Sequence, residues 1–281
     1  MTANDTVLRP TVAEALSTAT AAVGASDARA LLSHLLKCSP AFLVAHPEHE
    51  LPDDDAQRYA GLVTRRAAGE PVAYITGERE FYSLSFAVTP AVLIPRPETE
   101  LLVDVALERI VPHSDCRVLD LGTGSGAVAL SVARHRPRVH VVAIDASEAA
   151  LQIAHANARR LAVANVGFIV GNWYQNLAGR KFDAIIANPP YVAEGDPHLM
   201  QGDLRFEPRA ALAAGGDGLS CIRHIIAGAA AHLSPGGWFA FEHGYDQAAA
   251  CRALLDEAGF RDIVSRRDLA GIERVTAGHP A

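Results

Sequence analysis

Four residues able to hold a planar nitrogen group follow a predicted strand at residues 182–187. They are Asn188, Pro189, Pro190 and Tyr191. Proline fixes its own backbone and restricts the preceding residue to extended geometry, so an amide side chain, backbone carbonyls and an aromatic ring should meet at one point. This arrangement would suit a carboxamide or the amino group of an adenine. The four residues alone leave that choice open.

A glycine-rich loop follows an earlier predicted strand at residues 117–121 and opens a helix. The loop comprises Gly122, Thr123, Gly124, Ser125 and Gly126, and Asp120 stands directly before it. Glycine lets a backbone turn sharply and approach a ligand closely. The spacing G-x-G-x-G differs from the G-x-G-x-x-G of dinucleotide-binding enzymes. An acid beside the loop would attract the cationic amino-acid end of a cofactor and would repel a pyrophosphate.

Two further positions favour a nucleoside cofactor. Asp145 ends the predicted strand at residues 139–145, about 20 residues past the glycine turn, where an acid hydrogen-bonds ribose hydroxyls. Capping the next helix is its alternative role, although Ser147 is the better cap. Together the loop and the acid favour S-adenosylmethionine over a nicotinamide dinucleotide.

Asn172 and Trp173 follow the next predicted strand, at residues 166–170. In such a sheet this position lies beside the adenine, where an amide could bond the base edge and an indole could pack on the base. A core tryptophan is the alternative interpretation of Trp173.

Several other polar residues could belong to the same site. Arg96 and Glu98 lie in a proline-rich turn that either lines the site or caps the helix after it. Glu207 lies in the segment at residues 192–217, which is long for an idle connection and would suit a loop that covers substrate. Glu242 and His243 end a strand, and we expect their polar groups to be satisfied structurally. The histidines show no metal-ligand spacing, so no metal site is expected.

The elements that would position these residues divide along the chain. Residues 1–70 read as helices only, with Ser26 or Asp27 as the expected cap of the second helix. Residues 71–95 predict a hairpin or extended linker. Strands then alternate with helices, among them a helix predicted at residues 127–135 and a strand predicted at residues 238–243. This alternation predicts a mostly parallel sheet with right-handed crossovers.

Composition narrows the class of protein. The chain has 281 residues, 49% of them hydrophobic, and a net charge of −7, which counts against a basic face for duplex nucleic acid. Its four cysteines lack C-x-x-C spacing and are expected to be free thiols in the cytoplasm. No run approaches the roughly 18 apolar residues of a membrane span, and no signal peptide is recognisable.

With these residues in view, the chain resembles the release-factor glutamine methyltransferases, the HemK/PrmC family. The resemblance covers nearly the whole length. The motifs that carry it are Gly-Glu-Pro-Val-Ala-Tyr at residues 69–74 with Gly-Glu-Arg-Glu-Phe at 77–81, Leu-Ile-Pro-Arg-Pro-Glu-Thr-Glu at 93–100, the loop at 120–126, Asn-Pro-Pro-Tyr at 188–191, Glu-Pro at 207–208, and Pro-Gly-Gly at 235–237 through Glu-His-Gly at 242–244. The glycine loop and Asn-Pro-Pro-Tyr are each shared with other methyltransferases, whereas the proline-rich turn joined to both is far more specific.

The resemblance implies a class I S-adenosylmethionine-dependent methyltransferase, a Rossmann-like α/β fold with a mostly parallel seven-stranded sheet and a small N-terminal helical bundle. It implies a helical substrate-recognition domain over residues 1–75, a β-hairpin linker over 76–95 and the methyltransferase domain over 96–281. The expected reaction methylates N5 of the glutamine in the Gly-Gly-Gln motif of peptide chain release factors and leaves S-adenosylhomocysteine. A ribosomal-protein glutamine, or an adenine amino group on nucleic acid, is the alternative acceptor.

The residues themselves and the resemblance together assign roles to individual positions. Asn188, Pro189 and Tyr191 would be catalytic, and these three with Pro190, Arg96, Glu98 and Glu207 would contact the substrate. The cofactor contacts would be Asp120, Gly122, Thr123, Gly124, Ser125, Gly126, Asp145, Asn172, Trp173 and Asn188. Asn172 departs from the family, which commonly has aspartate there. A monomer without a membrane or nucleic-acid partner is expected.

Overall fold

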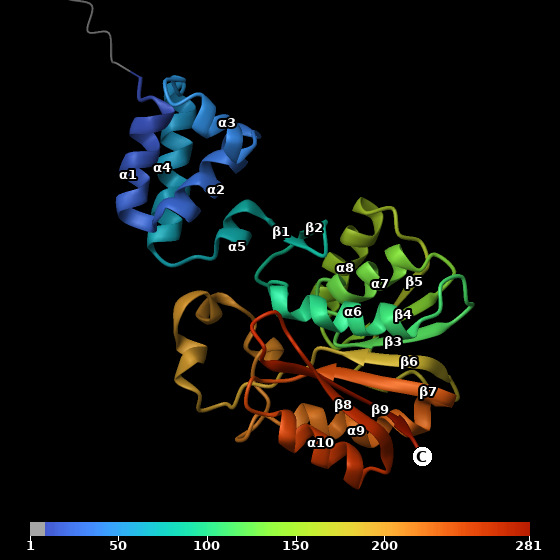
Figure 1. Cartoon of the computed structure of the whole chain (residues 1–281). Coiled ribbons are helices and arrows are strands. Elements are labelled where there is room, and N and C mark those ends of the chain that lie inside the picture. Colours follow the sequence, from blue (N-terminus) through green and yellow to red (C-terminus); the bar gives the residue numbers. More distant parts are fainter. Residues whose placement is uncertain (1–8) are drawn as a thin grey trace, which may run out of the picture. The chain divides into compact units, whose positions relative to one another are not determined.

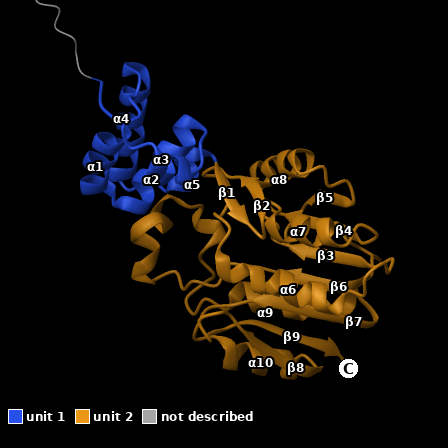
Figure 2. Cartoon of the chain, turned by 45° about the horizontal axis from the view of Figure 1, so that its top comes forward, with its two compact units in different colours: residues 1–77 blue, residues 78–281 orange. Residues whose placement is uncertain are grey.

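The computed structural model describes residues 9–281, and the chain divides into two compact units, one up to Gly77 and one from Glu78 (Figure 2). The first unit is helical (Figure 1). Its helices are α1 (Val12–Val23), α2 (Ala25–Leu36), α3 (Pro40–Ala45), α4 (Asp53–Ala67) and α5 (Val72–Thr76). They enclose an apolar cluster that includes the fully buried Leu31 and Leu32.

Local chemistry explains where these helices begin. Thr11 caps α1 in a capping box, in which its backbone N–H donates to the Glu14 carboxylate at 2.8 Å. The prediction that Ser26 or Asp27 caps α2 is wrong. Gly24 is the N-cap, because its φ of +83° lets one residue end α1 and begin α2. Asp27 therefore lies inside the helix, where it accepts a hydrogen bond from Arg66 of α4 at 2.6 Å.

The second unit begins with an antiparallel hairpin, β1 (Glu78–Phe81) and β2 (Leu84–Ala87). A hairpin was one expectation for residues 71–95, but the helix α5 occupies the first part of that stretch. A 3-10 turn at Pro97–Thr99 then leads into α6 (Glu100–Arg109). The hairpin is tied to the sheet region by Asn157, whose Oδ1 accepts from the Ala87 N–H at 2.7 Å.

The central sheet has seven strands in the order β5-β4-β3-β6-β7-β9-β8, and β9 runs opposite to the other six, so the predicted sheet is confirmed. The strands are β3 (Arg117–Leu121), β4 (His140–Asp145), β5 (Val166–Val170), β6 (Phe182–Ala187), β7 (Leu233–Glu242), β8 (Phe260–Arg267) and β9 (Glu273–Pro280). Strand order reverses between β3 and β6. In open α/β sheets ligands bind at such a switch point, beyond the carboxyl ends of the strands.

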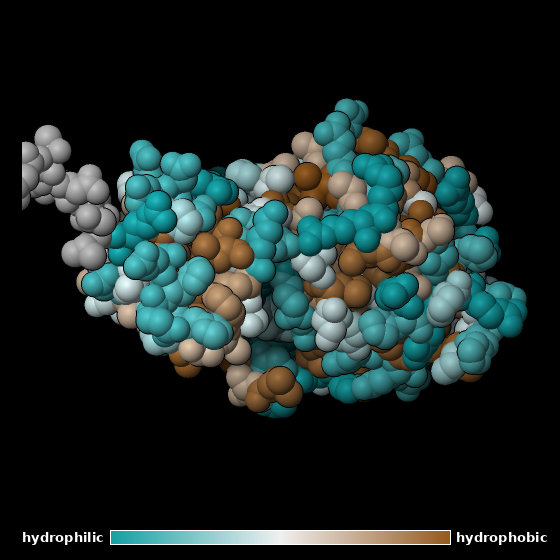
Figure 3. Space-filling view, turned by 90° about the horizontal axis from the view of Figure 1, so that it is seen from above, coloured by the Kyte–Doolittle hydropathy of each residue, from teal (hydrophilic) through white to brown (hydrophobic). Residues whose placement is uncertain are grey.

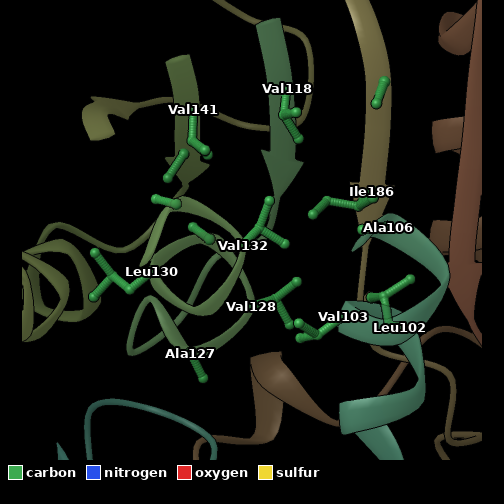
Figure 4. Close-up of a cluster of buried hydrophobic side chains, with 14 of the residues drawn as sticks. Leu102, Val103, Ala106, Val118, Ala127, Val128, Leu130, Val132, Val141 and Ile186 are labelled. Carbon is green, nitrogen blue, oxygen red and sulfur yellow. The ribbon is translucent and has the colours of Figure 1, made fainter. Parts of the chain in front are cut away.

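Helices cover both faces of this sheet. They are α6, α7 (Ala127–His135), α8 (Glu148–Arg160), α9 (Ser220–His232) and α10 (Ala248–Glu257). Successive strand residues point to opposite faces, so Val118 joins the cluster containing α7 whereas Leu119 joins the cluster containing α9. Figure 4 shows Val118 and Val141 of the strands facing Val132 of α7. These two clusters fix the ends of β3, β4 and β6.

The visible face of the molecule in Figure 3 is mostly hydrophilic, with scattered hydrophobic residues. Within residues 9–281, no helix combines the length and apolar character that a membrane crossing requires. The same residues contain no group of three or more histidine, cysteine or acidic side chains arranged to hold a metal ion.

Candidate active site

A cavity of about 470 Å³ opens in the second unit, beside the residues that follow β3, β4 and β6. Its volume falls within the roughly 300–1,000 Å³ typical of small-molecule sites. The structure brings ten of the predicted site residues to its lining. They are Asp120, Gly122, Thr123, Gly124, Ser125, Asp145, Asn172, Trp173, Asn188 and Pro190.

The glycine loop needs its glycines for both conformation and space. Gly122, Gly124 and Gly126 all have positive φ, at +73°, +55° and +82°. A side-chain carbon added at Gly126 would approach Leu130 to 3.0 Å, and one at Gly122 would fill space 3.6 Å from the Trp173 ring. The loop therefore turns into α7 while its backbone stays open toward the cavity.

Asp145 holds the loop in place from the end of β4. Its two carboxylate oxygens accept hydrogen bonds from the backbone N–H groups of Gly124 and Ser147, each at 2.8 Å. Ser147, and not Asp145, caps α8, because its hydroxyl accepts from the Ala150 N–H. A carboxylate has about four lone-pair positions, so Asp145 retains acceptor capacity toward the cavity.

Asp120 carries a second, more deeply buried carboxyl group on the cavity wall. The Thr123 hydroxyl donates a hydrogen bond to it at 2.6 Å. Burial raises the pKa of Asp120 to about 7, and the nearby Asp145 charge adds to the rise. A cationic group in the cavity would stabilise the ionised form, since opposite charges lower the pKa of a carboxyl.

Asn188 presents its side-chain amide in a defined orientation. Its Nδ2 donates a hydrogen bond to the Thr99 hydroxyl at 3.1 Å. Among the described residues, no donor reaches the Asn188 Oδ1 or the carbonyl oxygen of Pro189. Two acceptors of the Asn-Pro-Pro-Tyr motif are therefore free.

The Tyr191 ring was expected to face the planar nitrogen group of the substrate, and the structure gives it a different environment. It is packed against the α9 side of the core and does not line the cavity. Its hydroxyl donates to the Glu242 carboxylate at 3.0 Å, and burial raises the pKa of the tyrosine well above its ordinary value. The observed contact ties the end of the motif to β7.

Arg96 and Glu207, both predicted to contact substrate, form an ion pair with each other. Glu207 also accepts a hydrogen bond from the Ile94 N–H at 3.0 Å. Neither residue lines the cavity, although Pro208, which follows Glu207, does. Glu98 is half-buried, and its charge raises the pKa of Tyr191 and Glu242.

Sequence reasoning missed part of the site. Thr99 lines the cavity and bonds Asn188, which is 89 residues away in the chain. Leu93, which begins the proline-rich motif, forms an apolar wall of the cavity together with Ala91 and Val92, and these last two residues were also not singled out. Their position directly before the proline-rich turn is the feature of the sequence that could have identified them as part of the site.

Comparison with known proteins agrees with this geometry. Two family models match the chain, the PrmC N-terminal domain over residues 11–77 and the methyltransferase small domain over residues 97–219. The release factor glutamine methyltransferase of Xylella fastidiosa is 51% identical, over 94% of this chain and 96% of the relative. That of Burkholderia pseudomallei is 53% identical, over 90% of this chain and 91% of the relative.

The fold is also found in more distant solved structures. A methyltransferase from Pyrococcus furiosus matches 80% of this chain and all of its own with a TM-score of 0.54, at 18% identity. That likeness concerns the fold alone. The sheet order and the matched methyltransferase domain make this a class I methyltransferase fold. On the extent and level of identity to these relatives, the chain belongs to the release factor glutamine methyltransferase family.

Proposed function

We propose that this protein transfers a methyl group from S-adenosylmethionine to the side-chain N5 of the glutamine in the Gly-Gly-Gln motif of a peptide chain release factor. The relatives at about half identity carry the name of this activity. The observation that carries the proposal is the free acceptor at Asn188 Oδ1 in the wall of a nucleoside-sized cavity, next in the chain to the free carbonyl of Pro189, which does not itself line the cavity.

The cavity lining fits the cofactor. Gly122 and Gly124 keep backbone close to the cavity without side chains, and Asp145 offers spare acceptor positions to ribose hydroxyls. Asp120 would pair with the cationic amino-acid end, while Asn172 and Trp173 would flank the adenine. Thr123, Ser125, Gly126 and Asn188 complete the proposed contacts. Bound there, S-adenosylmethionine would supply a methyl group activated by the positive charge on its sulfur.

The protein's own contribution is to orient a weak nucleophile. The lone pair of an amide nitrogen is delocalised into its carbonyl, by the resonance that makes peptide bonds planar. Asn188 Oδ1 and the Pro189 carbonyl would each accept one N–H of the substrate amide, fixing the nitrogen and increasing its electron density. The nitrogen loses one proton to water after it gains the methyl group, so the site needs no strong base. Pro190 would bound the substrate glutamine on the cavity wall.

The remaining assignments rest on the arrangement of the second unit and on the relatives. Arg96 and Glu207 would act on the substrate indirectly, by holding the segment at residues 192–217, and Tyr191 and Glu98 by their positions around Glu242. Residues 1–75 would form the domain that recognises the release factor. Residues 76–95 would link it to the methyltransferase domain, residues 96–281, which would catalyse the methyl transfer. The four free cysteines support a cytoplasmic location. We expect a monomer, which light scattering during size-exclusion chromatography would test.

Transfer of a labelled methyl group to a purified release factor tests the function. The matched acceptor is the same release factor with the glutamine of its Gly-Gly-Gln motif changed to glutamate, which has no amide nitrogen. Labelling of the first and not the second supports the proposal. Equal labelling of both would contradict it.

A further inference from the structure

Two buried residues stand behind the Asn188 amide. Thr99, only 3% exposed, accepts the Asn188 Nδ2–H at 3.1 Å. Glu242, at the end of β7, is completely buried, and its Oε1 accepts the Tyr191 hydroxyl at 3.0 Å. Its second oxygen, Oε2, has no hydrogen-bond partner within the described part of the chain. A buried carboxylate oxygen left unpaired is costly, so an available donor should turn toward it.

The Thr99 hydroxyl is a donor that could turn toward Oε2, although the structure records no hydrogen bond between the two groups. A hydroxyl has one hydrogen to donate and two lone pairs to accept with. Because Thr99 already accepts from Asn188, its hydrogen is free for another acceptor. Its hydroxyl lies close enough to Glu242 to lower the pKa of that carboxyl, against the larger effect of burial, which raises it. The other groups that act on this pKa are Tyr191, Glu98 and Arg274.

The direction of this hydrogen bonding decides which end of the Asn188 amide faces the cavity. While Thr99 donates to Glu242, it can only accept from Asn188, so the amide must turn its Nδ2 to Thr99 and its Oδ1 outward. If Glu242 did not accept the hydrogen of Thr99, Thr99 could instead donate it to Asn188 Oδ1, and the amide would then present its NH₂ group to the substrate. An NH₂ group cannot accept a hydrogen bond from a substrate amide.

We propose that Thr99 and Glu242 are positioning residues for the methyl transfer, because their hydrogen-bond chain holds the Asn188 amide with Oδ1 toward the substrate. Glu242 thereby fixes both ends of the Asn-Pro-Pro-Tyr motif, directly at Tyr191 and through Thr99 at Asn188. The proposal rests on the proposed function for its catalytic consequence. Its structural part, the fixed orientation of one amide, is independent of the acceptor.

Kinetics of four variants test the catalytic consequence. Thr99→Val removes the hydroxyl at nearly constant volume, and we expect kcat on a release factor to fall at least tenfold while the cofactor Kd changes less than about threefold. Thr99→Ser restores the hydroxyl and should recover most of kcat. Glu242→Met removes both acceptor oxygens and should match Thr99→Val, and the double variant should be no slower than either, because both break one chain. Wild-type kcat in Thr99→Val, or additive losses in the double variant, would overturn the proposal.

Thr276→Val is the matched control. Thr276 is also a fully buried threonine, and its hydroxyl bonds the His243 Nε2 at 2.8 Å, but it does not line the cavity. This variant should lower the midpoint of thermal unfolding and keep kcat within about twofold. A kcat loss equal to that of Thr99→Val would mean that removing any buried threonine hydroxyl of this unit lowers kcat, and the proposal would fail.

A readout without turnover separates this inference from the proposed function. In the enzyme without methyl donor, the side-chain NH₂ signals of Asn188 can be assigned by NMR from their loss in Asn188→Asp. We expect one proton shifted and protected from exchange in the wild type and in Thr99→Ser, but not in Thr99→Val. Unprotected signals in the wild type would overturn the inference. Protected signals in a protein that leaves release factors unmodified would sustain it and refute the function.

Discussion

Arg96 and Glu207 form an ion pair that joins the turn before α6 to the segment at residues 192–217. The Glu207 side chain is completely buried, and it also accepts the Ile94 N–H. The residues that follow it, Pro208, Ala210 and Ala211, line the cavity. The pair thus fixes one wall of the site from outside the cavity.

Breaking this pair should destabilise the protein strongly. Arg96→Met leaves the Glu207 charge buried without its partner, which costs about 3–5 kcal/mol in comparable cases. Urea denaturation would measure the loss, and the double variant Arg96→Met with Glu207→Gln should recover part of it.

Arg138→Met is the matched control for that loss. Its partner Asp115 is 69% exposed, so solvent already screens the charges and little stability should be lost. Equal losses for Arg96→Met and Arg138→Met would show that the burial of Glu207 has no energetic consequence.

Asp145→Asn should weaken cofactor binding at least tenfold. Both oxygens of Asp145 face backbone N–H groups, so an amide NH₂ at either position opposes a donor and disturbs the loop at Gly124. Calorimetric titration with S-adenosylhomocysteine would give the Kd. Asp183→Asn is the matched control. The Asp183 carboxylate also accepts a backbone N–H, that of Arg117, but at the start of β3 and so at the end away from the glycine loop; this variant should leave the Kd unaltered. Indistinguishable Kd values for wild type and Asp145→Asn would contradict the assignment.

Asn188→Ala should reduce kcat at least tenfold, since one of the two amide acceptors is lost, while circular dichroism still shows the folded protein. Asn165→Ala provides the comparison. Asn165 is another hydrogen-bonded amide, which donates to the carbonyl of Val139 at 2.8 Å away from the cavity. That variant should lose stability and keep its kcat. Rates of Asn188→Ala near those of wild type would remove the amide from the mechanism.

Glu242 should make the protein less stable as the pH rises. Burial raises its pKa in the folded protein to about 7, above the ordinary value of 4.5. Between these values the folded state binds more protons than the unfolded state, so unfolding free energy falls as pH increases from about 4.5 to 7. Asp120, whose pKa burial also raises to about 7, should likewise lower the unfolding free energy as the pH increases.

Glu242→Gln isolates the contribution of this one carboxyl. The stability of the wild type minus that of Glu242→Gln should be greater at pH 5 than at pH 8, measured by urea denaturation at each pH. An identical difference at both pH values would show that Glu242 has an ordinary pKa in the folded state.

The sequence predicted the elements whose signals are local. The strands at residues 117–121, 166–170 and 182–187 and the helix at residues 127–135 occur with the predicted bounds, because apolar runs and flanking glycines mark them. The five-residue helix α5 was missed, since so short a helix has little periodicity. β7 begins at Leu233, before the predicted Trp238, and includes the Pro-Gly-Gly stretch that reads as a turn.

Contacts between residues that are far apart in the chain could not be predicted from the sequence. Arg96 and Glu207 were both singled out as substrate contacts, but their pairing across 111 residues depends on the fold. Thr99 belonged to a recognised motif, yet nothing local indicated that it would bond Asn188. The cofactor and substrate contacts assigned to individual residues stay predictions until they are measured.

The acceptor of the methyl group is the central claim, and one competition experiment addresses it. The protein would be incubated with S-adenosylmethionine carrying an isotopically labelled methyl group, purified release factor and intact ribosomes together. Mass spectrometry of the digested proteins and RNA would then locate the label. We predict label on the glutamine of the Gly-Gly-Gln motif in the release factor. Label on a ribosomal protein or on an adenine of the RNA, with none on the release factor, would contradict the account.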